Sequence, residues 1–377
     1  MRVLIMSVTA GQGHHATAQA IAVPLREQGH TVEILDTFAY ASPMLKEFVD
    51  KGYLLATRLV PEGYGMVYDR LNRNNKPSGK YSPGSLMSHM LMQDMERYVT
   101  TFAPDIIITV HCFSAAILNQ MIRAGVTHAL TVGVITDFTV HPYWQDAPDL
   151  DYYLVADRLL GFQLVRKNLD LKKMLPFGIP VHPKFYRYRS RTEAREALHL
   201  DPDRKTLMII SGSMGYGRLD EQIRLLDRMP NDFQSVVVCG NNQAMENKIR
   251  RMELHKPFRI YGYVNNVDEM MDAADCVVTK PGGLTVSEAL AKRLPMILAN
   301  PIPGHERLNA EFLLNNQLAM MATETYGLDE AVYTLLEQPG FLERLRGNCE
   351  IFQRDKGNSA LRLVKFLTEK VKEREKS

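Results

Sequence analysis

The chain has 377 residues, of which 45% are hydrophobic and 23% charged, and its formal net charge at pH 7 is +2. This length exceeds that of a usual single domain and the composition is typical of a globular protein, so we expect two domains. A net charge so close to zero does not favour a general nucleic-acid binder, whose surface would carry a strong basic stripe.

The cysteines and the hydropathy of the chain indicate the cellular compartment in which the protein is expected. Its four cysteines are scattered and form no Cys-x-x-Cys pair, which is typical of reduced thiols rather than of disulfides or zinc ligands. It has no run of 18 apolar residues, and the apolar run at its N-terminus is too short for a signal peptide. We therefore expect a cytoplasmic protein that neither spans a membrane nor is exported.

The first elements expected are a strand, a helix and a second strand. The apolar run Val3–Val8 predicts a buried parallel strand that ends in a glycine turn, and a helix is expected from about Ala16 to Gln28. The run Thr31–Asp36 predicts the second strand. This order indicates an α/β domain.

The glycine turn admits two interpretations. Gly11, Gly13 and Ala16 satisfy the G-x-G-x-x-G/A fingerprint, with Asp36 about twenty residues further on, so an NAD-dependent oxidoreductase is one alternative. His14 and His15 argue against it, because they place imidazoles where a pyrophosphate needs close backbone. A histidine at this position is better suited to proton transfer than to binding phosphate.

Residues 42–97 combine an apolar surface with a basic one. The apolar side chains lie between Leu45 and Val60, and the basic residues that follow are Arg70, Arg73, Lys76 and Lys80. An apolar helix beside a basic stretch can rest on an anionic bilayer surface. A core helix followed by a solvated loop is the alternative, and both interpretations stay open.

Polar residues follow each later strand of the first half. Apolar runs at 104–110, 130–135 and 152–155 predict buried strands, and His111, Asp137 and His141 follow the first two of them. The carboxyl ends of parallel strands share one edge of a sheet, so we expect these three residues to converge with His14 in one crevice.

A proline-containing linker at 177–183 leads into a second α/β half. Its predicted strands are Lys205–Ile210, Ser235–Cys239, Phe258–Val264, Cys276–Thr279 and Pro295–Ala299. A glycine turn follows the first of these strands, as it does in the first half. The repeat predicts two Rossmann-like halves with a cleft between their carboxyl edges.

The segment Lys280–Glu288 stands where a strand ends and a helix begins, which is where α/β proteins bind phosphates. Its glycines allow close backbone approach, and Glu288 can reach a ribose. Amides at Ser213 and Gly215 would complete a diphosphate site, and the loop with Glu306 and Asn309 could read sugar hydroxyls. We expect no Asp-x-Asp triplet to hold a divalent cation here, so that a departing nucleotide diphosphate would be stabilised without a metal or other cofactor.

Four segments together resemble the monogalactosyldiacylglycerol synthase and processive diacylglycerol glucosyltransferase family of glycosyltransferase family 28. They are residues 11–21, 104–108, 136–144 and 280–288. The resemblance implies a GT-B fold, a UDP-sugar donor, inversion at the anomeric carbon and a diacylglycerol acceptor. It also implies a peripheral protein on the inner, anionic face of the cell membrane.

The expected organisation is an acceptor domain at 1–178, a UDP-sugar domain at 179–358 and a C-terminal helix at 359–377 that could pack back on the first domain. The expected catalytic residues are His14, which corresponds to the family's proposed base, and Asp137. Donor-binding residues are expected at Gly13, Ser213, Met214, Gly215, Tyr263, Val264, Lys280, Gly282, Gly283, Leu284, Thr285, Glu288, His305, Glu306 and Asn309. Acceptor-binding residues are expected at His15, His111, His141 and Trp144.

Other functions remain open at this point. The lack of the long N-terminal extension of plastid members favours a bacterial glucolipid synthase, and so glucose over galactose. A lipid II-type enzyme that transfers N-acetylglucosamine to a polyprenyl-diphosphate acceptor would share the fold and the glycine turns. A non-catalytic nucleotide-sugar-binding protein would share the donor site.

Overall fold

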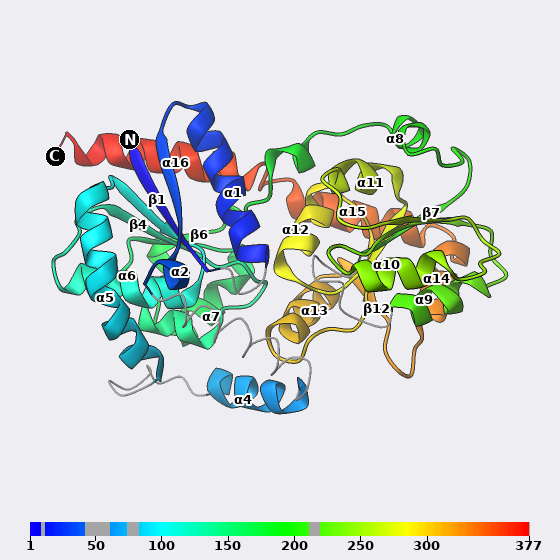
Figure 1. The fold of residues 1–377 in the computed structure, drawn as a ribbon, viewed down its shortest axis with the longest axis horizontal. Coiled ribbons are helices and arrows are strands. Elements are labelled where there is room, and N and C mark those ends of the chain that lie inside the picture. Colours follow the sequence, from blue (N-terminus) through cyan, green and yellow to red (C-terminus); the bar gives the residue numbers. More distant parts are fainter. Residues whose placement is uncertain (9–11, 42–60, 74–82, 211–218, 377) are drawn as a thin grey trace. The chain divides into compact units, whose positions relative to one another are not determined.

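The computed structural model describes residues 1–8, 12–41, 61–73, 83–210 and 219–376, which form two compact units (Figure 1). The first unit comprises Met1–Pro183, Pro303–His305 and Lys356–Ser377, and the second comprises Lys184–Ile302 and Glu306–Asp355. The predicted turn with Ser213, Met214 and Gly215, and the apolar stretch Leu45–Val60, lie outside the described residues.

The N-terminal unit is built on a parallel six-stranded sheet. Its strands are β1 (Arg2–Ser7), β2 (Thr31–Asp36), β3 (Ile106–Thr109), β4 (Leu130–Val134), β5 (Tyr152–Leu154) and β6 (Met174–Leu175). They lie in the order β2-β1-β3-β4-β5-β6. β1, β3 and β4 are almost wholly buried, which is why they appear in the sequence as continuous apolar runs.

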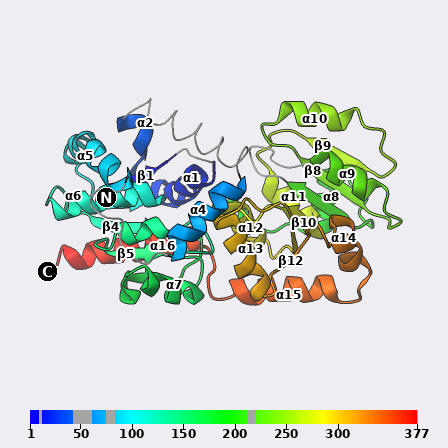
Figure 2. The same ribbon diagram turned by 90° about the horizontal axis from the view of Figure 1, so that it is seen from below.

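Helices cover this sheet on both faces (Figure 2). The helices of this unit are α1 (Gln12–Glu27), α2 (Thr37–Ala41), α4 (Pro61–Arg73), α5 (Pro83–Phe102), α6 (Cys112–Arg123), α7 (Gly161–Arg166) and α16 (Ser359–Arg374), with 3₁₀ turns η1 (Pro142–Asp146), η2 (Arg158–Leu160) and η3 (Leu171–Lys173). A further 3₁₀ turn, η4 (Pro183–Tyr186), spans the boundary to the second unit. The apolar face of α16 joins the same core as α1 and the strands. This burial attaches the end of the chain to the unit that contains its beginning.

The C-terminal unit repeats the parallel six-stranded plan. Its strands are β7 (Thr206–Ile210), β8 (Gln234–Val238), β9 (Phe258–Tyr261), β10 (Cys276–Thr279), β11 (Met296–Leu298) and β12 (Ala319–Met321), in the order β12-β11-β10-β7-β8-β9. β6 and β12 are not predicted from the sequence; β12 consists of an alanine and two methionines, which are not among the residue types enriched in strands. The helices are α8 (Arg191–Ala197), α9 (Leu219–Asp227), α10 (Gln243–Arg250), α11 (Val267–Ala273), α12 (Gly283–Ala291), α13 (His305–Asn315), α14 (Leu328–Glu337) and α15 (Phe341–Gln353).

Two helices begin earlier than predicted, and both differences bear on function. α1 begins at Gln12 rather than near Ala16, so His14 belongs to a helical first turn. α12 begins at Gly283 rather than at Val286, so Thr285 also lies in a first turn. Glycine and polar residues weaken the apolar pattern at these starts, but the helical backbone continues through them.

Each sheet contains a point where the strand order reverses. In the first unit the chain moves outward from β1 to β2 and then returns to β3 on the other side of β1. In the second unit it moves from β7 through β8 to β9 and then returns to β10 beside β7. Loops at the carboxyl ends of such neighbouring strands diverge and leave a crevice, so ligand sites are expected after β1 and β3 and after β7 and β10.

A buried ion pair joins strands at the opposite, amino-terminal edge of the second sheet. Asp275 is 1% exposed, and its Oδ2 accepts hydrogen bonds from Arg195 at 2.6 Å and from the backbone N–H of Thr206 at 2.8 Å. The carboxylate therefore connects α8 to the starts of β7 and β10.

No helix among the described residues is both long enough and apolar enough to cross a bilayer.

Candidate active site

His14 lies in the first turn of α1, and its ring is held through one nitrogen. Nδ1 is 2.9 Å from the carbonyl oxygen of Val110 and 3.1 Å from Oγ1 of Thr136. A carbonyl oxygen can only accept a hydrogen bond, so Nδ1 carries the proton of the neutral ring. Nε2 is then the nitrogen with the lone pair, as a general base requires.

The surroundings of His14 keep it neutral at physiological pH. The ring is partly open to solvent, yet enough protein surrounds it that burial lowers its pKa below the ordinary 6.5. The charge of Asp137 and the hydrogen bond to Val110 oppose this effect and raise the pKa. Asp137 is thus placed to stabilise the imidazolium that forms when His14 takes up a proton.

His111 and His141 cap the elements that follow them. Nδ1 of His111 accepts from the N–H of Phe113 at 3.2 Å at the start of α6, and Nδ1 of His141 accepts from the N–H of Tyr143 at 3.2 Å at the start of η1. Burial lowers the pKa of both rings, that of His141 to about 3. In the neutral ring Nε2 then carries the proton, so each could donate a hydrogen bond to an acceptor oxygen.

The histidines converge as the strand-end argument predicts. The rings of His14 and His111 meet edge to face with centroids 4.7 Å apart. Tyr68 of α4 lies 5.0 Å from the ring of His141, again edge to face. We call His14, His111, His141 and Asp137 the histidine cluster. The sequence contains no pattern that would place Tyr68 there, whereas Thr136 directly precedes Asp137 after a strand.

Three other predicted residues of this unit have different surroundings. Gly13 lies beside His14 in α1, and Nε2 of His15 is 3.3 Å from Nε2 of Gln19 one turn along the same helix. Trp144 is 3% exposed, and a Cβ on Gly133 would lie 2.7 Å from its ring. The structure therefore gives Trp144 a packing role against β4, and its predicted contact with the acceptor is not favoured.

In the second unit the start of α12 has no side-chain cap among the described residues. Gly282 precedes the helix and provides no side-chain cap for its first N–H groups. These groups belong to the turn that contains Gly283, Leu284 and Thr285, and the helix dipole makes this end positive. Such an N-terminus is suited to bind a phosphate.

Two residues predicted to read the sugar also hold the turn before α12. Glu306 is 5% exposed, and its carboxylate accepts from Lys280 Nζ at 3.1 Å and from the N–H of Ile302 at 2.8 Å. Asn309 is fully buried and donates to the carbonyl of Pro281 at 3.0 Å. Both side chains thus hold the turn before α12, where the sequence predicts a phosphate site. His305 is the first residue of α13, immediately before Glu306.

Glu288 lies in the second turn of α12 and is partly buried. Burial raises the pKa of its carboxyl to about 8, while the charge of Lys184 lowers it and that of Asp268 raises it further. Tyr263 and Val264 follow β9, and the ring of Tyr263 is 65% exposed. These positions, like the others for the donor, remain predictions.

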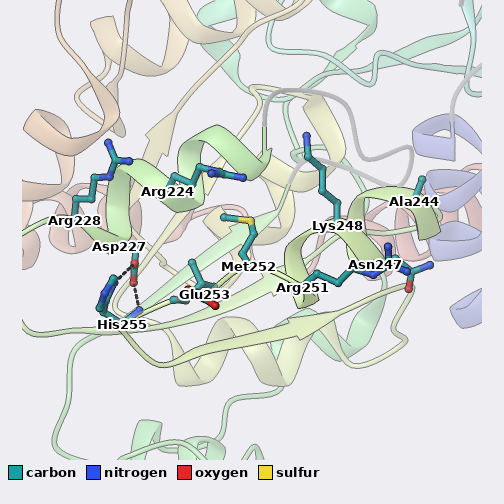
Figure 3. Close-up of a pocket in the computed structure, with 11 residues that line it drawn as sticks. Arg224, Asp227, Arg228, Ala244, Asn247, Lys248, Arg251, Met252, Glu253 and His255 are labelled. Atoms are coloured by element: carbon teal, nitrogen blue, oxygen red, sulfur yellow. Dashed lines mark hydrogen bonds and ion pairs between the residues drawn. The ribbon is translucent and has the colours of Figure 1, made fainter.

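A hollow of about 870 Å³ lies elsewhere in the C-terminal unit, between α9, α10 and the loop after α10 (Figure 3). Exposed Arg224, Arg228 and Arg251 line it, and at its edge Asp227 accepts from His255 Nδ1 at 2.9 Å. None of the predicted site residues that the structure describes lines this hollow.

Asp-x-Asp triplets do occur, at Asp149–Asp151 and Asp201–Asp203, but each precedes a strand. Asp151 accepts from the backbone N–H of Thr131 at 2.8 Å and lies just before β5. Asp203 lies before β7, at the amino-terminal edge. Neither triplet is therefore at the ligand-binding edge of its sheet.

The chain has two Rossmann-like units, with a hydrogen-bonded histidine at the start of α1 in the first and, in the second, a helix N-terminus without a side-chain cap among the described residues. These features are those of a nucleotide-sugar transferase of the GT-B class. Residues 14–181 match the family described as monogalactosyldiacylglycerol (MGDG) synthase, and residues 206–353 match the glycosyltransferase family 28 C-terminal domain. The chain carries both of these domains and is a glycosyltransferase.

The relatives and solved structures agree with this assignment. The processive diacylglycerol beta-glucosyltransferase of Bacillus licheniformis is 27% identical over 354 residues, which are 92% of this chain and 90% of that protein. The crystal structure of Acinetobacter baumannii MurG matches with a TM-score of 0.65 at 16% identity, over 98% of this chain and 99% of that one. Anabaena Alr3699/HepE in complex with UDP-glucose matches with a TM-score of 0.58 at 13% identity, over 99% and 100% of the two chains. At these identities the two structures show the shared fold.

Proposed function

We propose that this chain transfers a hexose, preferentially glucose, from a UDP-sugar to the free hydroxyl of 1,2-diacylglycerol, which produces a membrane glycolipid. The observation that carries the proposal is the geometry of His14, whose Nδ1 is hydrogen-bonded to the carbonyl of Val110, so that its Nε2 carries the lone pair that a base needs. The Bacillus licheniformis relative, similar over nearly the whole of both chains, supports diacylglycerol as the acceptor.

The first unit would activate the acceptor. Nε2 of His14 takes the proton of the lipid hydroxyl as its oxygen attacks the anomeric carbon from the face opposite the UDP group, which inverts the configuration. The charge of Asp137 stabilises the imidazolium that results. His111 and His141, through their Nε2–H groups, could hold the acceptor oxygens in position for this attack.

The second unit would stabilise the leaving group. The carbon–oxygen bond to UDP breaks with its electron pair on the diphosphate, and the N-terminus of α12 together with Lys280 offsets this negative charge. Glu288 would accept from the ribose hydroxyls. The proposed mechanism assigns charge stabilisation to these groups and requires no metal ion.

The acceptor is a lipid, so the enzyme would work as a peripheral protein at the inner, anionic face of the cell membrane. Incubation of the protein with a panel of radiolabelled UDP-sugars, diacylglycerol vesicles and EDTA, followed by chromatography of the lipids, tests donor, acceptor and metal dependence together. A glycolipid from UDP-glucose is the expected product, and a ladder of products would show successive additions. Transfer only from UDP-N-acetylglucosamine to a polyprenyl-diphosphate acceptor would contradict the proposal.

A further inference from the structure

The segment from η2 to η3, residues 158–173, exposes an unusual amount of apolar surface. Leu159, Phe162, Val165 and Leu171 are 54%, 67%, 52% and 48% exposed. They lie within 13 consecutive residues at the periphery of the N-terminal unit, where α7 is drawn in Figure 2. Single exposed apolar residues need no explanation, but a group of this kind indicates an interaction surface.

These side chains share one face because of their spacing. Leu159, Phe162 and Val165 are three residues apart along η2 and α7, whereas Leu160 and Leu164 on the opposite face are fully buried. Leu171 lies beside α7, since a Cβ on Gly161 would be 2.9 Å from its Cδ1. The buried leucines fix the orientation of the exposed ones, so this face cannot turn inward without loss of core packing.

Exposed cations surround the apolar group. They are Arg158, Arg166 and Lys172, and the guanidinium of Arg166 lies 4.6 Å from the centre of the Phe162 ring. Of the nearby carboxylates, Asp157 forms an ion pair with Lys356 at 2.7 Å, and exposed Asp170 accepts from the backbone N–H of Lys172 at 2.9 Å. The outward face is therefore apolar at its centre and net positive at its rim.

Other lysines of the segment connect it to the rest of the unit. Lys173 Nζ donates to the carbonyl of Leu150 at 2.8 Å, and Lys167 Nζ donates to the carbonyl of Asn72 at 2.8 Å. Asn72 lies near the end of α4, within the stretch that the sequence analysis associates with a bilayer. The end of α4 and residues 158–173 are thus neighbours in the fold although almost a hundred residues apart in the chain.

We propose that residues 158–173 dock on an anionic lipid bilayer, with Leu159, Phe162 and Val165 inserted at the headgroup boundary and the three cations paired with lipid phosphates. This proposal rests on the proposed function, which requires the enzyme to reach a membrane lipid. A second copy of the chain fits the face less well, because a two-fold interface would set the same cations against one another.

Sedimentation with vesicles tests the proposal without any sugar donor. The variant Arg158→Gln/Arg166→Gln/Lys172→Gln should lose about fivefold in affinity for each charge on vesicles rich in phosphatidylglycerol, and added salt should abolish the difference. The variant Leu159→Ser/Phe162→Ser should lose on the order of tenfold or more at any salt concentration. Thermal melts would verify that both variants are folded.

Matched controls come from exposed residues elsewhere in the chain. Ile351→Ser removes an apolar side chain that is 61% exposed on α15, and Arg228→Gln/Arg251→Gln removes two exposed arginines of the C-terminal unit. Both controls should bind vesicles as the unaltered protein does. Unchanged binding of the segment variants, equal losses in the controls, or self-association that depends on Phe162 would each overturn the proposal.

A separate assay distinguishes failure of this proposal from failure of the proposed function. Transfer to diacylglycerol dispersed in detergent micelles needs the active site but no bilayer. The segment variants should retain this activity while losing activity on vesicles. Equal losses of activity in micelles and on vesicles would contradict a docking role for the segment.

Discussion

Replacement of His14 by asparagine separates the two roles of this side chain. The amide nitrogen of asparagine occupies nearly the position of Nδ1, so the variant can still donate to the carbonyl of Val110, which lies 2.9 Å from Nδ1 in the native chain. It has no counterpart of Nε2. His14→Asn therefore removes the base and retains the contact that anchors the start of α1.

The expected loss in kcat follows from this separation. A general base contributes about 10²–10⁴-fold, which corresponds to about 3–5 kcal/mol in the activation barrier. The free energy of unfolding should change little in His14→Asn. In His14→Ala it should fall by a further 1–3 kcal/mol or so, because the Val110 carbonyl then loses its donor.

The pH dependence gives an independent check. Burial lowers the pKa of His14 below 6.5, so the neutral, active form predominates at pH 7 and activity is lost as the pH falls through this lowered value. The acid limb of kcat/KM should therefore lie below pH 6.5 and should be absent in His14→Asn. Rates of lipid glycosylation within threefold of the native rate, with unchanged UDP binding, would refute the assignment of His14 as the base.

Two further predictions concern carboxylates of the C-terminal unit. Burial raises the pKa of Glu288 to about 8 from 4.5, so the folded protein holds a proton that the unfolded chain releases, and stability falls as the pH rises between these values. Glu288→Gln should accordingly raise the melting temperature at pH 9 but not at pH 4, and equal shifts at both would contradict this. Asp275→Asn should lower the free energy of unfolding by about 3–5 kcal/mol in denaturant titrations, because Arg195 is left buried without its charged partner. The exposed Asp203→Asn provides the control, and a similarly small effect in both variants would show that the ion pair contributes little.

The strands show which parts of the fold can be predicted from the sequence and which cannot. A central parallel strand is covered on both faces, so β1, β3 and β4 have to be apolar throughout, and this pattern is readable without a structure. β12 has only three residues, and its pairing with β11 is a contact between distant segments. Short strands of this kind depend on their neighbours rather than on their own residues.

The candidate site likewise has features that the sequence predicts and features that it does not. The sequence locates His14, His111 and Asp137 after strands and thereby predicts that they converge. It cannot tell which nitrogen of His14 is the base, because the carbonyl of Val110 that decides this is a backbone group 96 residues away. Nor can it show that the side chain of Asn309 donates to the carbonyl of Pro281 and so holds the turn before α12.

By itself, therefore, the sequence determined the family, the two α/β halves and the strand ends that carry the chemistry, since these follow from local patterns and short motifs. Only the tertiary structure decided the strand order that brings β1 beside β3 and β7 beside β10, the tautomer of His14 and the burial of Trp144. It also decided which apolar side chains of residues 158–173 stay outside the core. The physical reason is that these properties arise from contacts between distant parts of the chain.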